Sequence, residues 1–199
     1  SRRPGSRLTV MGVDPGLTRC GVGIVRGGVG TPLELLGVGV IRTPSDLDHG
    51  ARLLRIHDGL EEWFDAHHPD AMAVERVFAQ HNRSTVAGTA QAMGLTQMIG
   101  ARHGVAVGVH TPSEVKAAIS GSGRADKAQV GLMVARVLHL EKPPTPADAA
   151  DALALAITHI WRGGTQSRIE AAMAVHQHSP ARTWRQRSAP RTRQEHHLR

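Results

Sequence analysis

The order of predicted strands and helices constrains the fold of this chain more than any other feature of its sequence. Three short runs rich in apolar and β-branched residues come first, over 8–13, 21–26 and 33–42. Glycine-rich turns separate them, and Asp14-Pro15-Gly16 stops the first run. Short strands joined by tight turns favour an antiparallel meander.

The pattern then changes to alternating helices and strands. Apolar residues at a helical period predict a helix over 49–67, and further helices are expected over 84–103, 112–119, 125–140 and 146–161. Buried strands are predicted between them over 71–77 and 105–110. Helical crossovers imply parallel pairing. The sequence therefore predicts an α/β domain with a mixed five-stranded sheet flanked by helices.

Composition narrows the class of protein further. The chain has 199 residues, which suggests one domain or one domain with a tail. The single cysteine, Cys20, excludes an intramolecular disulfide and a cysteine zinc cluster, and it fits a reducing cytoplasm. No apolar run approaches the length of a membrane-spanning helix, and the basic N-terminus lacks the apolar segment of a signal peptide.

Positive charge is concentrated at the C-terminal end. The formal net charge is +7, and residues 162–199 contain eight arginines against two glutamates. We therefore expect a disordered N-terminal extension over 1–7, a folded domain over 8–162 and a disordered basic tail over 163–199. Such a tail is either an arm that binds nucleic acid or a solvated segment without a partner. Its scattered histidines do not have helical metal-ligand spacing.

Four carboxylates occur where solvation does not explain them. Asp14 ends an apolar strand, Glu75 interrupts another, and Asp148 and Asp151 lie on one face of the first turns of an apolar helix. Each also has a purely structural explanation. Asp14 could cap a turn, and Glu75 could form an ion pair with Arg76 or Arg52. Asp148 and Asp151 could be acids favoured by a helix N-terminus. Solvation accounts for most other acids, namely Asp46, Asp48, Asp58, Glu61, Glu62 and Asp65.

The strand ends of such a sheet converge at one edge, where ligands bind. Carboxylates gathered there would repel one another unless cations neutralised them. Oxygen ligands suit Mg²⁺ or Mn²⁺ rather than zinc. Two such ions form the usual arrangement for phosphodiester hydrolysis.

Five segments, in this order, resemble the RuvC family of Holliday junction resolvases, within the RNase H-like (integrase) superfamily. They are Gly12-Val13-Asp14-Pro15-Gly16, Val74-Glu75-Arg76-Val77-Phe78, Thr111-Pro112-Ser113-Glu114-Val115-Lys116, Ala125-Asp126-Lys127-Ala128-Gln129-Val130 and Ala147-Asp148-Ala149-Ala150-Asp151-Ala152-Leu153-Ala154. Each is weak alone, but five in order are specific. The resemblance covers about residues 8–161.

This resemblance implies an RNase H-like fold and a homodimer that cuts two opposed strands of a four-way DNA junction, in recombination and repair. The nicks would depend on Mg²⁺, with two ions per site and Mn²⁺ as a possible substitute, and would leave 5′-phosphate and 3′-hydroxyl ends. The family's catalytic carboxylates fall on Asp14, Glu75, Asp148 and Asp151, its two functional lysines on Lys116 and Lys127, and its base-stacking aromatic on Phe78. Its usual partners are the RuvA–RuvB branch-migration proteins.

The residues themselves suggest roles within that scheme. Asp14, at the centre of the sheet, can face both ions, with Glu75 on one and the two helix aspartates on the other. The two lysines would add positive charge near the phosphate. Phe78 lies in a polar loop, where it could stack on an unpaired base, and His81, Asn82 and Arg83 beside it could contact the backbone.

The helix predicted over 84–102 carries small and apolar residues nearly all round. Such a helix should be buried on more than one side, against the sheet and against a second subunit. A two-fold dimer would suit the near two-fold symmetry of a junction.

Three other functions compete with this interpretation. An RNase H-like nuclease with a different substrate, such as the YqgF-type relatives, shares most of the pattern, although the 147–153 segment and Phe78 favour a resolvase. An actin-like kinase would need a duplicated fold, and the sequence shows no repeat. A catalytically dead DNA-binding module is disfavoured because unneutralised acids would weaken DNA binding.

Overall fold

A computed structural model describes residues 7–76 and 83–177, with the backbone alone described at 83–85 and 164–177. Within it the chain separates into two compact units, Ser1–Thr165 and Gln166–Arg199. All the elements described below belong to the first unit, except the end of the last helix. No helix in the described ranges is both long and apolar enough to cross a membrane.

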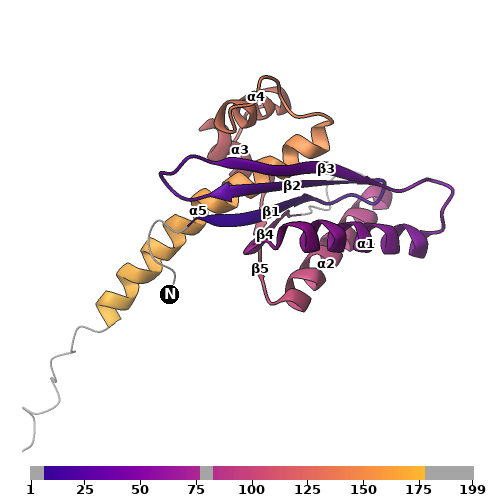
Figure 1. The fold of residues 1–199 in the computed structure, drawn as a ribbon, viewed down its shortest axis with the longest axis horizontal. Coiled ribbons are helices and arrows are strands. Elements are labelled where there is room, and N and C mark those ends of the chain that lie inside the picture. Colours follow the sequence, from indigo (N-terminus) through magenta and orange to yellow (C-terminus); the bar gives the residue numbers. More distant parts are fainter. Residues whose placement is uncertain (1–6, 77–82, 178–199) are drawn as a thin grey trace, which may run out of the picture. The chain divides into compact units, whose positions relative to one another are not determined.

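In the described ranges, five strands and five helices follow one another in the predicted order. The strands are β1 (Leu8–Asp14), β2 (Arg19–Gly27), β3 (Glu34–Arg42), β4 (Ala71–Glu75) and β5 (Ala106–His110). The helices are α1 (His49–His67), α2 (Arg83–His103), α3 (Pro112–Ser120), α4 (Lys127–Val137) and α5 (Ala147–Gln177). Figure 1 shows the sheet with helices on both faces.

The sheet has the order β3-β2-β1-β4-β5. The pairs β1–β2 and β2–β3 are antiparallel, whereas β1–β4 and β4–β5 are parallel. The predicted mixed five-stranded sheet is therefore confirmed, with the meander and the crossovers on the expected strands. Strand β1 is central, so its carboxyl end meets the ends of its neighbours.

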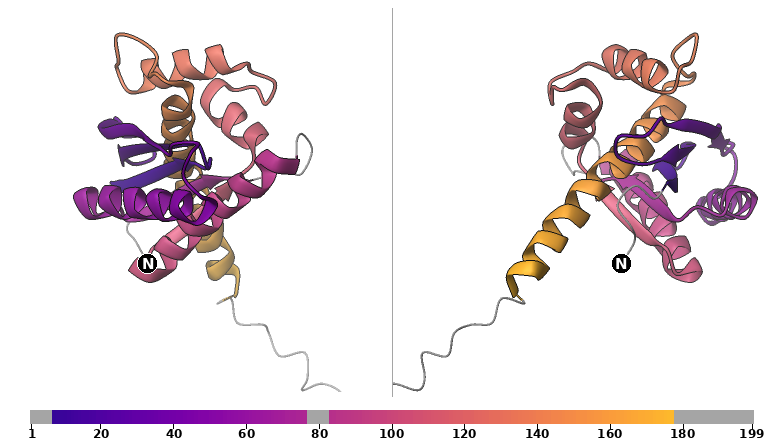
Figure 2. Two further views of the ribbon diagram at one scale, coloured as in Figure 1. Left: turned by 90° about the vertical axis from the view of Figure 1, so that its right-hand side faces the viewer. Right: turned by 60° about the vertical axis from the view of Figure 1, so that its left-hand side comes forward.

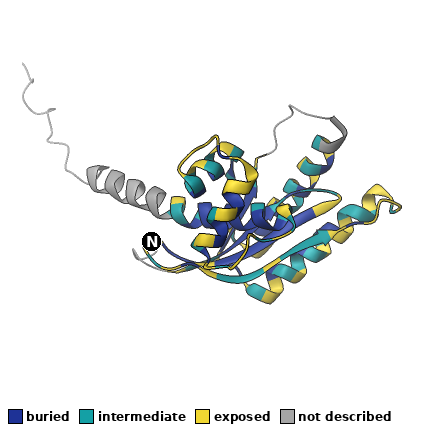
Figure 3. Cartoon of the chain, turned by 90° about the horizontal axis from the view of Figure 1, so that it is seen from above, coloured by how far each residue is buried: buried dark blue, intermediate teal, exposed yellow. Residues whose placement is uncertain are grey.

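Side chains of the central strands alternate between the two faces of the sheet, and each face packs into its own hydrophobic core. Met11 and Val13 of β1 pack with α1 and α2 on one face, together with Ile56, Leu60 and Ile99. Val10 of the same strand faces the opposite core. That core is built from α3, α4 and the buried stretch of α5. Figure 2 shows these layers from two further directions, and Figure 3 shows buried residues concentrated in the sheet and in α5.

Glycines let α5 lie directly against the sheet. A Cβ on Gly12 of β1 would overlap the carbonyl oxygen of Ala152, and a Cβ on Gly21 of β2 would overlap the carbonyl oxygen of Asp148. A Cβ on Gly23 of β2 would meet the side chain and the backbone nitrogen of Leu153. The backbone of α5 therefore approaches strands β1 and β2 more closely than any side chain would allow.

Two predicted boundaries were wrong. The last helix does not end near Trp161 but continues to Gln177, so the segment expected to be disordered begins with a helix. Residues 166–177 contain three alanines and two glutamines, which are good helix formers, and no proline or glycine. Strand β4 ends at Glu75, so this carboxylate lies at the strand end and not within it. Residues 1–6 and 178–199 lie outside the described ranges.

Candidate active site

Two of the candidate carboxylates come from adjacent strand ends. Strands β1 and β4 are parallel and pair through Val13 and Val74, so Asp14 and Glu75 follow that pair side by side. Asp14 is also the last residue of β1 to pair with β2, opposite Gly21. Both acids are partly buried. The central strand and its neighbour thus place two carboxylates at one edge of the sheet.

The other two carboxylates come from the start of α5. Asp148 and Asp151 are three residues apart, and the side chains are 23% and 22% exposed. The close approach at Gly21 puts the first turn of α5 over the start of β2, beside Asp14. The same glycine contact that allows dense packing therefore brings the helix acids to the strand acids.

Capped helices supply the two candidate lysines. Thr111 and Glu114 form a capping box at the start of α3, which carries Lys116 one turn later. Asp126 and Gln129 form a second capping box, and Lys127 is the first residue of α4. Both boxes satisfy free backbone amides at the helix N-terminus. These caps fix where each helix begins and hence where each lysine stands.

A further contact fixes α3 against α5. Arg162 of α5 forms an ion pair with Glu114 at 2.7 Å. The pKa of Glu114 is lowered to about 2, first by the backbone amide of Thr111 and then by the Arg162 side chain. The helix that carries Lys116 is therefore held to the helix that carries Asp148 and Asp151.

A pocket of about 210 Å³ joins these groups. Its lining includes three of the four carboxylates, both lysines and apolar residues of α3 and α4: Asp14, Glu75, Pro112, Val115, Lys116, Lys127, Val130 and Asp151. Asp148 is not part of that lining, but it is close enough to act electrostatically on Asp14. The structure thus brings all four predicted acids to one place, with Asp148 at its border.

The electrostatics of this pocket are unfavourable without a cation. Burial raises the pKa of Asp14 to about 8, and the negative charges of Asp151, Glu75 and Asp148 contribute to the same rise. The pKa of Glu75 is also raised, first by burial and then by Asp151. Each carboxylate disfavours the charged form of its neighbours. Such a site favours the binding of positive charge.

Protein cations neutralise the two helix acids. Lys127 Nζ lies 2.9 Å from Asp151 Oδ2, and this hydrogen bond is the main cause of the raised pKa of Lys127. Arg19 lies against Asp148, with Nε at 2.8 Å and Nη2 at 2.6 Å from the same oxygen, Oδ2. Arg52, one suggested partner for Glu75, instead donates to the hydroxyls of Thr18 and Thr43.

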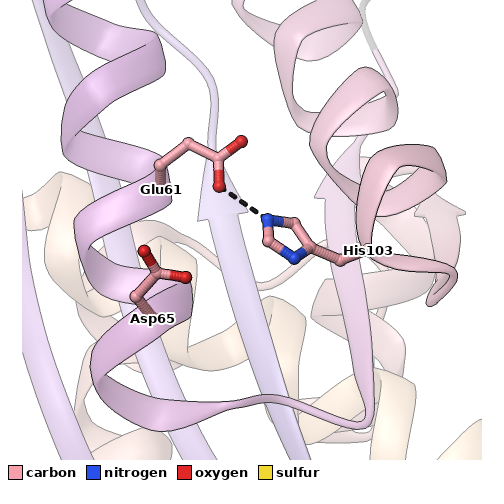
Figure 4. A group of neighbouring side chains, drawn as sticks. All are labelled: Glu61, Asp65 and His103. Carbon is pink, nitrogen blue, oxygen red and sulfur yellow. Dashed lines mark hydrogen bonds and ion pairs between the residues drawn. The ribbon is translucent and has the colours of Figure 1, made fainter.

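A second group of possible metal ligands lies elsewhere, between α1 and α2. Glu61, Asp65 and His103 place one ligand atom each within 4.8 Å of one another, the only such trio in the described ranges (Figure 4). His103 Nε2 contacts Glu61 Oε2 at 2.6 Å, and Arg102 lies 3.6 Å from Glu61 Oε1. A guanidinium beside the carboxylate makes this an ion-pair network that ties two helices together.

Glu61 also corrects the sequence interpretation. Solvation was expected to explain its charge, but its side chain is only 17% exposed and His103, Arg102 and His57 surround it. The helical pattern of α1 did not reveal this, because the partners come from α2 or lie one turn away. Charge on an amphipathic helix indicates solvent only where no second helix covers it.

The sequence interpretation also missed two groups near the pocket. Arg19, the counter-charge of Asp148, starts β2 and shares a face with Gly21 and Gly23, a pattern that strand alternation could have revealed. His110 pairs with Glu75 in the sheet register, and its Nε2 lies 3.0 Å from Nδ1 of His159 on α5. Burial and His159 lower the pKa of His110 to about 4, so it is neutral near pH 7.

Some predicted DNA contacts are not described by the structure. Phe78, His81 and Asn82 lie in 77–82, outside the described residues. Arg83 is the first residue of α2, described by its backbone alone. Their predicted roles therefore remain predictions.

The chain matches a known protein family over most of its length. The family model described as crossover junction endodeoxyribonuclease RuvC matches residues 10–159. A protein of that name from Cutibacterium acnes is 75% identical over 173 residues, which cover 86% of this chain and 88% of that protein. The protein of that name from Streptomyces avermitilis is 61% identical over 169 residues, covering 85% and 96% of the two chains.

Solved structures agree with the sequence comparison. RuvC of T. thermophilus, solved in complex with a Holliday junction substrate, superposes with a TM-score of 0.76 at 33% identity. That match covers 80% of this chain and 97% of the other. The yeast mitochondrial Holliday junction resolvase Ydc2 matches with a TM-score of 0.56 at 11% identity, which shows a shared fold.

Proposed function

This chain belongs to the RuvC family of crossover junction endodeoxyribonucleases, and we propose that the pocket around Asp14 is its catalytic site. The protein is an endonuclease that resolves four-way DNA junctions in homologous recombination and repair. The observation that supports the proposed site is the convergence of Asp14, Glu75 and Asp151 on one pocket with Asp148 at its border. The enzyme cuts two opposed strands of the junction and leaves 5′-phosphate and 3′-hydroxyl ends.

The residues of the pocket fit hard divalent cations. The donors are carboxylate oxygens, the ligands that Mg²⁺ and Mn²⁺ prefer. Burial raises the pKa of Asp14, and the negative charges of the neighbouring carboxylates add to that rise. We infer that these four carboxylates hold two Mg²⁺ ions, with Mn²⁺ as a substitute. When bound, such ions lower the pKa of water and stabilise charge on a leaving oxygen.

The remaining pocket residues act on the substrate phosphate. Lys116 of α3 and Lys127 of α4 line the pocket together with the strand acids. Their ammonium groups offset the charge of a phosphodiester entering an acidic site, and they stabilise the additional charge that develops during cleavage. The apolar lining from Val115 and Val130 excludes water from one wall.

Contacts to DNA beyond the scissile phosphate are proposed for the segment that follows Glu75. Strand β4 ends at Glu75 and α2 begins at Arg83, so the connecting residues leave from the edge of the pocket. Phe78 would stack on an unpaired base, while His81, Asn82 and Arg83 would contact the backbone. Together with Lys116 and Lys127, they would form the DNA-binding set.

A homodimer would provide two such pockets for two strands. Helix α2 supports this proposal because it leaves an uncovered stripe of small and apolar residues, Ala87, Ala90, Gly94 and Met98. Two copies related by a two-fold axis would present equivalent sites to a symmetric junction. We further propose that the dimer works with the RuvA–RuvB branch-migration complex in the bacterial cytoplasm, where chromosomal junctions arise.

Incubation with a synthetic four-way junction and with linear duplex, with Mg²⁺ and then with a chelator, tests this function. We expect paired symmetric nicks on the junction alone, and only with the metal. Asp14→Asn should still shift the junction in a gel but leave it uncut. Asp58→Asn is the matched control, since Asp58 lies on α1 with its side chain 59% exposed, and it should cut normally. Binding without cleavage by the unmutated protein would indicate a dead module.

A further inference from the structure

Arg19 is a charged side chain at the pocket border to which the proposed function gives no role. It starts β2, and its side chain is 44% exposed. Two nitrogens of its guanidinium, Nε and Nη2, converge on the single oxygen Oδ2 of Asp148, at 2.8 and 2.6 Å. A fork held by two contacts has a defined orientation, which a lone flexible cation lacks.

The position of Arg19 follows from the packing of the strand. Residues 19, 21 and 23 of β2 share one face, because side chains alternate along a strand. Gly21 and Gly23 on that face contact the backbone of α5, Gly21 at Asp148 itself. Arg19 precedes these two glycines on the same face and carries a long side chain. Its contact with Asp148 therefore follows from the sheet geometry.

Charge around Asp148 explains what this contact does. Asp148 acts unfavourably on Asp14, and the described part of the pocket contains two further carboxylates. A guanidinium on Asp148 therefore offsets part of the repulsion in the metal-free protein. The same guanidinium occupies an oxygen that a cation would need, and it repels that cation.

We propose that Arg19 is a resident counter-cation of the catalytic pocket, which holds Asp148 in the metal-free protein and which a divalent ion displaces from it. This inference rests on the proposed metal-binding role of the four carboxylates. Arg19 is thus a positioning residue that stabilises the empty pocket and weakens its affinity for metal. Its removal should change these two properties in opposite directions.

Mn²⁺ binding to the full-length protein without DNA, measured by titration calorimetry, tests the proposal. Arg19→Gln should lower the Kd for Mn²⁺ roughly fivefold, the size of effect that a partly exposed ion pair can reach. It should also lower the melting temperature of the metal-free protein. Arg19→Lys keeps the charge and should leave the Kd close to that of the unmutated protein.

Arg26→Gln is the matched control. Arg26 lies on the same strand, is also 44% exposed and pairs with Glu34 at 2.8 Å, away from the pocket. It should leave the Kd unchanged. An equal Kd for Arg19→Gln and the unmutated protein would overturn the proposal, and so would weaker binding, which would make Arg19 a support that orients Asp148 for the metal. Absence of Mn²⁺ binding to the unmutated protein would instead contradict the proposed function.

Discussion

Asp14 has the most unfavourable charge of the described residues in the pocket. Its carboxyl would ionise near the ordinary aspartate pKa of 3.8 in the unfolded chain, whereas in the folded protein the pKa is about 8. Between these values the folded state binds more protons than the unfolded state. The free energy of unfolding of the metal-free protein therefore decreases as the pH rises through this window. A bound divalent cation would weaken this pH dependence by neutralising the negative charge around Asp14.

Thermal unfolding of the metal-free protein should show this dependence. We expect the melting temperature to fall between pH 7 and 8, where the buried His110 and the partly buried His159 are mostly neutral in both states and contribute little. Asp14→Asn should flatten the profile, and so should saturating Mg²⁺. A melting temperature that stays constant or rises over this range would contradict the assignment of Asp14 as a buried, proton-binding carboxyl.

Metal binding should be coupled to the same proton. Because Asp14 is largely protonated at neutral pH without a cation, divalent binding must release that proton. The affinity for Mg²⁺ should therefore rise between pH 6 and pH 8. Calorimetry in two buffers of different ionisation enthalpy measures the released proton directly, and an identical heat in both buffers would argue against it.

At the scale of elements, the site depends on how closely α5 approaches the sheet. Gly12 and Gly21 allow backbone contact between α5 and strands β1 and β2, and this contact places Asp148 and Asp151 beside Asp14. A methyl group at Gly21 would collide with the backbone of Asp148, which no side-chain rotation can relieve. The chemistry of the pocket is therefore coupled to the packing of one helix.

Gly21→Ala should consequently damage stability and cleavage together. We expect it to lower the free energy of unfolding by about 1–3 kcal/mol, the usual cost of overpacking, and to reduce cleavage strongly by displacing Asp148. Gly163→Ala is the control within α5 itself, since a Cβ there meets nothing within 4 Å. It should stabilise the helix by roughly 0.5–1 kcal/mol and leave cleavage intact. Equal stability of the two variants in denaturant would contradict the close-packing argument.

Most elements and the four carboxylates could be predicted from the sequence, but some features could not. Periodicity and turn residues gave the correct order of strands and helices, and they placed α1 at His49–His67. The four carboxylates could be predicted because each breaks a local apolar pattern. Strand alternation places Arg19 on the same face as Gly21 and Gly23, but its partner could not be predicted, because Asp148 lies on a helix 129 residues away. The continuation of α5 to Gln177 is consistent with the helix propensity of the alanines and glutamines in its last turns.

For the whole molecule, the proposed homodimer requires a face that a single chain leaves open. Met98 is 48% exposed on α2, within the stripe that includes Gly94. A buried charge at such a position would oppose association. Met98→Glu should therefore shift the protein from dimer to monomer in sedimentation. Leu132→Glu, at a site on α4 that is 59% exposed, should not. A dimer that survives Met98→Glu would place the interface elsewhere.

A separate prediction for the whole molecule concerns the basic C-terminal segment, residues 168–199. Seven arginines lie in 168–199, while the rest of the chain is nearly neutral. If these arginines contact phosphates, deleting the residues after Gly164 should weaken junction binding and flatten its dependence on log salt by roughly 0.9 per lost contact. Replacing the seven arginines with glutamine tests the charge without removing the end of α5. An unchanged slope in both variants would show that the segment does not touch DNA.

The central claim is that Asp14, Glu75, Asp148 and Asp151 share one cation site. Anomalous diffraction from crystals soaked in Mn²⁺ tests it most directly. We expect manganese peaks between these four side chains, with carboxylate oxygens at roughly 2.0–2.2 Å. A peak at Glu61, Asp65 and His103, with none beside Asp14 at saturating Mn²⁺, would contradict it.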